Sequence, residues 1–133
     1  MGNASNGQSK PCILIVEDEV LVRMFAVDAL EDEGFKVEEC STASEALEKL
    51  QALQSEIVAV IVDLGLPDRP GDQLAAEMRA LRADLPILIA SGRSERELRE
   101  RFHIDGKIGI AVKPFTGPML LHALEKLGIT PNS

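Results

Sequence analysis

The chain has 133 residues, with 14 lysines and arginines against 22 aspartates and glutamates, which gives a net charge of −8 at pH 7. This length predicts a single domain, and because the basic residues form no uninterrupted cluster, nucleic-acid binding is not expected. No apolar stretch approaches the roughly 20 residues that span a bilayer, so we expect no membrane association and a cytoplasmic location.

Residues 1–10 are polar and glycine-rich and lack the apolar core of a signal peptide, so we expect a disordered tail. Five apolar runs follow, at 12–16, 36–40, 57–62, 86–90 and 108–112. Each precedes a segment with helical periodicity, and helices are predicted over 20–33, 43–54, 71–83, 94–102 and 117–127. This alternation predicts a doubly wound α/β domain, in which a parallel sheet is covered by helices on both faces.

Several predicted helices carry start or stop signals. Capping-box spacings, a proline in a first turn and terminal glycines occur at Thr42 with Glu45, Ser94 with Glu97, Pro118 after Thr116, Gly34 and Gly128. These signals place the first residues of three helices and the last residues of two.

The first predicted helix has two apolar stripes. The broad stripe consists of Val22, Phe25, Ala26 and Ala29, and the second consists of Val20, Met24 and Val27. A surface helix would normally be polar on the side opposite its broad stripe, so the second stripe is a candidate docking surface for a partner helix. The alternative is a set of scattered exposed apolar side chains with no partner.

Acidic side chains follow two of the apolar runs. Asp63 ends the run at 57–62, and Glu17, Asp18 and Glu19 follow the run at 12–16. The carboxyl ends of parallel strands share one edge, and clustered carboxylates there persist when a cation or proton offsets their charge. Oxygen ligands favour magnesium, manganese or calcium, although Glu17 and Glu19 taken singly are equally well explained as solvated loop acids.

Two further runs add a hydroxyl and an ammonium group to the same edge. Ser91 with Gly92 follows the fourth run, and Lys113 with Pro114 follows the fifth. Carboxylates, a cation, a lysine and a hydroxyl together fit phosphoryl transfer to an aspartate, in which positive charge and donors neutralise the phosphoryl oxygens.

These motifs together resemble the response-regulator receiver domain over residues 11–128. The resemblance is carried by Glu17-Asp18, Asp63 with Leu66-Pro67 and Gly71, Ser91-Gly92 and Lys113-Pro114-Phe115. It implies a flavodoxin-like fold with five parallel strands in the order 2-1-3-4-5, and residues 129–133 then form a C-terminal tail. It also implies a signalling domain, not an enzyme, that accepts phosphate from a histidine kinase or phosphotransfer protein and acts on an unknown downstream protein.

The resemblance also assigns residue roles. Asp63 is the expected phosphoacceptor, and Glu17, Asp18, Asp63 and the backbone carbonyl of Gly65 are the expected ligands of Mg²⁺, with Mn²⁺ as a possible substitute. Ser91 and Lys113 are expected to contact the phosphoryl group, and a cis peptide bond is expected before Pro114.

Some positions depart from the family pattern. Ile110 occupies the position where many receivers carry tyrosine or phenylalanine, so the usual aromatic switch is missing. Gly65 and Arg93 occupy positions whose side chains flank the attacking water in the family, and Gly65 leaves that space open.

Two other functions are compatible with parts of the sequence. The first is a receiver-like interaction module that works without phosphorylation, which the missing aromatic at Ile110 favours. The second is a Toprim-like metal-dependent phosphodiester enzyme, which is disfavoured because Gly65 occupies the place of the second aspartate in its Asp-x-Asp motif. The chain could be a stand-alone regulator or part of a hybrid kinase.

Overall fold

A computed structural model describes residues 10–101 and 106–131. Its five strands form one parallel sheet in the order β2-β1-β3-β4-β5, which confirms the predicted fold and strand order. The strands are β1 (Cys12–Val16), β2 (Lys36–Cys40), β3 (Ile57–Asp63), β4 (Ile87–Ser91) and β5 (Ile108–Val112). β3 extends one residue further than predicted, so Asp63 is the last residue of a strand, and β4 is shifted by one residue, so that it ends at Ser91.

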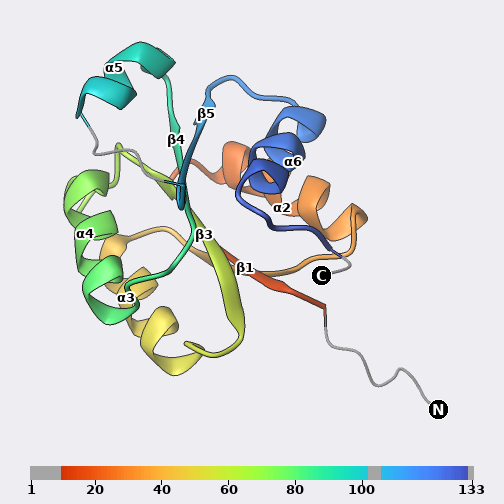
Figure 1. Ribbon diagram of the computed structural model, residues 1–133, viewed down its shortest axis with the longest axis horizontal. Coiled ribbons are helices and arrows are strands. Elements are labelled where there is room, and N and C mark those ends of the chain that lie inside the picture. Colours follow the sequence, from red (N-terminus) through yellow and green to blue (C-terminus); the bar gives the residue numbers. More distant parts are fainter. Residues whose placement is uncertain (1–9, 102–105, 132–133) are drawn as a thin grey trace.

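Helices cover both faces of the sheet (Figure 1). They are α2 (Val20–Asp32), α3 (Ala43–Ala52), α4 (Gly71–Leu81), α5 (Glu95–Arg101) and α6 (Gly117–Lys126). One apolar core lies between the sheet and α3, α4 and α5, and a second lies between the sheet and α2 and α6. None of the helices in the described part of the chain is long and apolar enough to cross a membrane.

The predicted helix signals act as expected where the chain is described. The Thr42 hydroxyl accepts a hydrogen bond from the Glu45 amide at 3.2 Å, and the Thr116 hydroxyl accepts one from the Met119 amide at 3.2 Å. Helix ends lie one or two residues before the predicted positions, because the residues after the last helical turn adopt cap or turn conformations. Phe102, the last residue of the predicted fourth helix, lies outside the described residues.

Gly34 and Gly128 lie just beyond the ends of α2 and α6. Their φ angles are +103° and +82°, a region in which a side chain is strained, so these two glycines end their helices as predicted.

The prediction for the apolar stripes of α2 is wrong at two positions. Val27 was expected on the exposed stripe but is only 8% exposed and packs in the second core, whereas Phe25 was expected to be buried and is 48% exposed. The helix turns the face shared by Ala26, Val27 and Leu30 toward the sheet, which moves Phe25 to the edge. Met24 is 53% exposed, as the prediction requires.

The predicted tail boundaries can be compared with the structure in part. Residues 1–9 and 132–133 lie outside the described residues. Ile129, expected to begin a C-terminal tail, instead packs against the second core, and its amide donates to the Leu124 carbonyl at 3.0 Å. Ile129, beyond residue 128, is thus part of the packed chain.

Candidate functional site

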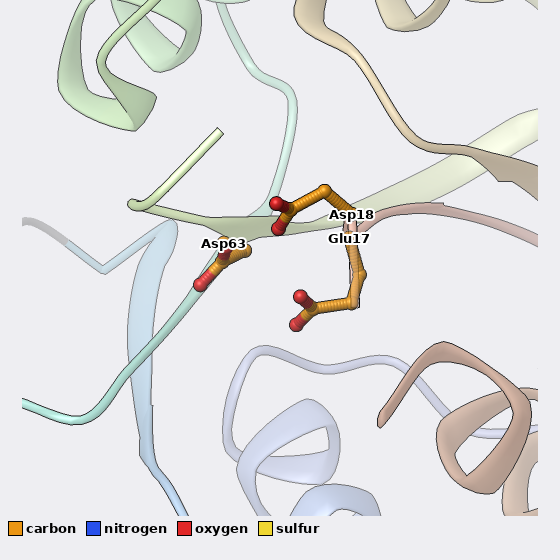
Figure 2. A group of neighbouring side chains, drawn as sticks. All are labelled: Glu17, Asp18 and Asp63. Atoms are coloured by element: carbon orange, nitrogen blue, oxygen red, sulfur yellow. The ribbon is translucent and has the colours of Figure 1, made fainter. Parts of the chain in front are cut away.

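The ends of β1 and β3 bring three carboxylates together. The final pair in the register of β1 and β3 is Val16 with Val62, so the next residues, Glu17 and Asp63, lie at the same edge of the sheet. One oxygen from each of Glu17, Asp18 and Asp63 lies within 4.8 Å of the others (Figure 2). Glu17 is 3% exposed and Asp63 is 7% exposed, so two of the three carboxylates are buried.

Lys113, directly after β5, partly offsets this negative charge. Its Nζ lies 2.7 Å from Glu17 Oε1 and 2.9 Å from Asp63 Oδ1. Glu19 is a more distant partner at 3.7 Å. The Lys113–Pro114 peptide bond is cis, as the family resemblance implies, and the Lys113 amide donates to the Ser91 carbonyl at 2.7 Å. These contacts hold the ammonium group beside the carboxylates.

Burial and pairing act in opposite directions on the titrating groups. Burial raises the pKa of Glu17, although its hydrogen bonds with Lys113 and with the Glu19 amide favour the ionised form. Burial alone would lower the pKa of Lys113, but its hydrogen bonds to Glu17 and Asp63 outweigh that effect and raise it. One ammonium group among several acids leaves negative charge in excess, which favours binding of a further cation.

The other residues predicted for the site, Ser91 and Gly65, line the same open cleft as two of the carboxylates. The cleft is lined by Asp18, Glu19, Asp63, Leu64, Gly65, Ser91, Gly92, Arg93 and Lys113. Ser91 is buried at the end of β4, and its hydroxyl accepts a hydrogen bond from the Arg93 amide at 3.1 Å. A Cβ atom placed on Gly65 would lie 3.5 Å from Asp63 Oδ2, so glycine leaves this side of the carboxylate open.

Arg93 and Ile110 make contacts with residues other than the three carboxylates. The guanidinium of Arg93 is directed to Glu97, with an Nη1 to Oε2 distance of 3.7 Å. Ile110 is partly buried, packs against the first core and is not among the residues that line the cleft. The structure therefore brings together Glu17, Asp18, Asp63, Ser91 and Lys113, and leaves Ile110 outside this group.

Arg23 is a residue of the site that sequence reasoning missed. Its Nη1 donates to the Glu17 carbonyl at 2.7 Å, and its Nε lies 3.2 Å from Glu39 Oε1. Arg23 thereby ties α2 to the end of β1, where the acidic residues begin. No sequence pattern around Arg23 indicates these contacts, because its partners Glu17 and Glu39 are 6 and 16 residues away in the chain.

An apolar surface lies beside this site. We name it the α2 patch and define it by Val20, Leu21, Met24 and Phe25, which are 55%, 80%, 53% and 48% exposed. The Phe25 ring is 6.3 Å from the Phe115 ring, between centroids. A groove next to the patch is lined by Leu21, Val22, Phe25, Lys113, Pro114 and Phe115. Lys113 lines both this groove and the acidic cleft, so the two surfaces are continuous.

The sequence matches a known family over most of its length. A family model described as "Response regulator receiver domain" matches residues 13–125. The sensor kinase CckA of Brucella abortus is 33% identical over 115 residues, which are 86% of this chain and 12% of that protein. The transcriptional regulatory protein PdtaR of Mycobacterium tuberculosis is 35% identical over 114 residues, which are 85% of this chain and 54% of that protein. The chain thus spans about half or less of these relatives.

Solved structures share the fold. The chemotaxis protein CheY4 of Vibrio cholerae has a TM-score of 0.81 and 26% identity, covering 90% of this chain and 99% of that one. A sensor protein from Polaromonas sp. JS666 has a TM-score of 0.76 and 30% identity, covering 88% of this chain and 94% of that one. These likenesses, with the family match, support the receiver interpretation over the Toprim-like alternative.

Proposed function

The chain belongs to the response regulator receiver domain family, a family of signalling domains of two-component systems, and from this premise we propose that Asp63 accepts a phosphoryl group in a Mg²⁺-dependent reaction. The observation that carries the proposal is the position of Lys113 Nζ, 2.9 Å from one oxygen of Asp63, while the other oxygen borders the open cleft at Gly65. The carboxylate is thus paired on one side and borders the cleft on the other, which suits a nucleophile.

The residues present fit a magnesium ion. Glu17, Asp18 and Asp63 offer three carboxylate oxygens within 4.8 Å of one another, and the backbone carbonyl of Gly65 is our fourth proposed ligand. Mg²⁺ prefers such oxygen ligands and retains several waters, which suits an open cleft. When bound, the ion would supply positive charge that stabilises the phosphoryl oxygens in the transition state.

The chain's own residues then have distinct parts in the transfer. A carboxylate oxygen of Asp63 attacks phosphorus, and the bond from phosphorus to the donor breaks. With a phosphohistidine donor this is a P–N bond, and the imidazole nitrogen keeps the electron pair. Lys113 and the Ser91 hydroxyl provide donors to the phosphoryl oxygens, and water later hydrolyses the acyl phosphate to reset the domain.

Acetyl phosphate provides a test that needs no protein partner. We expect the intact mass to increase by one phosphate in the presence of Mg²⁺ and to stay unchanged with EDTA. Asp63→Asn should abolish the adduct, whereas Asp28→Asn, at an exposed position of α2, should retain it. An equal adduct in both variants would show that Asp63 is not the acceptor. No adduct in the natural chain would favour a donor-restricted receiver or a phosphorylation-independent interaction module.

We further propose that the protein donor, a histidine kinase or phosphotransfer protein, docks on the α2 patch. The patch replaces the predicted stripe of Val20, Met24 and Val27, because Val27 is buried. Its groove shares Lys113 with the acidic cleft, so a helix resting on the patch would bring a phosphohistidine next to Asp63. Exposed apolar side chains of this kind are typical of helix-in-groove recognition.

A pair of methionines provides a matched test of docking. Met24→Glu should slow phosphorylation by the cognate protein donor but not by acetyl phosphate, because only the protein donor needs the patch. Met119→Glu is the control, since Met119 is similarly exposed, at 50% against 53% for Met24, and borders a different groove. Equal slowing with both donors, or an equal effect of the two substitutions on transfer from the protein donor, would contradict the proposed docking surface.

A further inference from the structure

The loop that follows Asp63, residues 64–70, is tied to the rest of the domain at successive positions. Leu66 is only 8% exposed and packs in the first core. At the end of the loop, the Gly71 amide donates to the Leu64 carbonyl at 3.3 Å. Gly65, whose carbonyl is a proposed magnesium ligand, lies between Leu64 and Leu66. Contacts that restrict the movement of the loop therefore also restrict the position of this carbonyl.

Asp68 ties the loop to the start of α3. Its Oδ1 accepts from the Ala43 amide at 2.9 Å, and its Oδ2 accepts from the Ser44 amide at 3.0 Å. The hydrogen bond from the Ala43 amide, followed by that from the Ser44 amide, lowers the pKa of Asp68. The helix already has its own cap, because the Thr42 hydroxyl accepts from the Glu45 amide. Asp68 therefore adds a link between two segments that are distant in the sequence.

Arg69 adds a second link. Its Nη1 donates to both carboxylate oxygens of Glu77 on α4, each at 2.8 Å, and its Nη2 donates to the Ser44 hydroxyl on α3 at 3.4 Å. Two consecutive loop residues thus bind two different helices. The loop cannot move away from the sheet edge without breaking both sets of contacts.

From these contacts we propose that Asp68 and Arg69 are positioning residues for magnesium binding, which hold the Gly65 carbonyl and the Asp63 carboxylate in one arrangement. The inference rests on the proposed function and assigns part of its metal affinity to residues outside the ligand set. Groups that orient metal ligands commonly contribute about 10–100-fold in affinity. Because Asp68 is exposed and three residues from Gly65, we expect about three- to tenfold.

A pair of variants separates positioning from simple helix capping. Asp68→Ala and Thr42→Ala each remove acceptors at the same end of α3, but only Asp68 comes from the loop. Titration with Mg²⁺ in a calorimeter should give a dissociation constant raised about three- to tenfold in Asp68→Ala and unchanged in Thr42→Ala. Asp68→Asn, which keeps one acceptor oxygen, should restore part of the affinity. In the absence of Mg²⁺, amide hydrogen exchange in residues 64–70 should be faster in Asp68→Ala than in Thr42→Ala.

Phosphorylation by acetyl phosphate completes the test. The magnesium concentration for half-maximal rate should rise in Asp68→Ala, while the rate at saturating Mg²⁺ stays near that of the natural chain. Arg69→Met, which removes the second link, should also raise the magnesium concentration for half-maximal rate. This variant replaces Asp68→Ala in the test if Asp68→Ala does not fold. Equal magnesium affinity in the Asp68, Arg69 and Thr42 variants would overturn the inference alone. Failure of the natural chain to bind Mg²⁺ would overturn the proposed function as well.

Discussion

Removal of the Lys113 ammonium group should destabilise the magnesium-free domain. Its Nζ lies 2.7 Å from Glu17 and 2.9 Å from Asp63, and the side chains of these acids are 4% and 9% exposed. Breaking a buried ion pair by removing one partner costs about 3–5 kcal/mol. Because the Lys113 side chain is itself 16% exposed, we expect Lys113→Met to lower the free energy of unfolding by about 3 kcal/mol, the lower end of that range.

Urea unfolding followed by far-ultraviolet circular dichroism measures this loss, since the chain has no tryptophan or tyrosine for fluorescence. Lys10→Met, at an exposed position, is the matched control. Adding Asp63→Asn to Lys113→Met should recover part of the loss, because one of the unpaired charges is removed. If the Lys113 and Lys10 variants were equally stable at pH 8 without magnesium, the ammonium group would not compensate the carboxylates.

The loss should also depend on pH. Burial raises the pKa of Glu17 in the folded state, and removal of the ammonium group would raise it further. A raised folded-state pKa gives stability that is present below the unfolded-state pKa and is lost as the pH rises through the folded-state pKa. The loss of unfolding free energy in Lys113→Met should therefore increase as the pH rises above 4.5, the ordinary pKa of a glutamate, and decrease below it. A deficit that does not change with pH would contradict this assignment.

Three further outcomes are expected. Gly71→Ala should lower the free energy of unfolding by about 1–3 kcal/mol, because its Cβ would lie 2.7 Å from both the Asp63 carbonyl oxygen and Leu64 Cα. Gly92→Ala, with no neighbouring atom within 4 Å, is the control, and equal urea midpoints would refute the clash. Magnesium at 100 times its dissociation constant should raise the unfolding free energy by about 2.7 kcal/mol, and an unchanged melting temperature would exclude binding to the folded state. Magnesium affinity should fall on acidification, because burial raises the pKa of Glu17 and a protonated carboxyl group is a poor ligand. Calorimetric titrations at several pH values measure this affinity, and an affinity that does not change with pH would contradict the role of Glu17 as a ligand.

The sheet and the acidic edge could be predicted from the sequence because local patterns determine them. The apolar run at 57–62 has no polar alternation, as expected of a strand covered on both faces, and it delivers Asp63 to the strand end. The strand order came from the family resemblance, since periodicity does not say which strands are neighbours. Glu17 and Lys113 were placed at one edge because each directly follows a strand of a parallel sheet, but their 2.7 Å contact required the structure.

The α2 patch and the loop links show what the sequence could not provide. Helical spacing gives the angles between Phe25 and Val27 but does not decide which of two apolar faces turns to the sheet. Packing of Ala26 and Leu30 against the sheet decides it, and this packing depends on residues from other elements. Asp68 accepts a hydrogen bond from the amide of Ala43, which lies 25 residues earlier in the chain, and no local pattern predicts such a contact.

We expect the absence of an aromatic side chain at position 110, where the chain has isoleucine, to affect signal output and not the proposed phosphorylation of Asp63. Ile110 packs against the first core and does not line the acidic cleft, so Asp63, Ser91 and Lys113 keep their arrangement without it. If Ser91 moves toward a bound phosphoryl group, no ring at position 110 can follow. We therefore expect the downstream contact to depend on other side chains of this face.

The most direct test of the account is to locate the phosphate. The natural chain is treated with acetyl phosphate and Mg²⁺, and borohydride then reduces the acyl phosphate so that the modified aspartate becomes homoserine. Fragment masses identify the residue, with a sample prepared in EDTA as the control. Conversion at Asp63, dependent on Mg²⁺, is the predicted result. Conversion at another residue, or equal conversion without magnesium, would contradict the proposal that Asp63 is the magnesium-dependent phosphoacceptor.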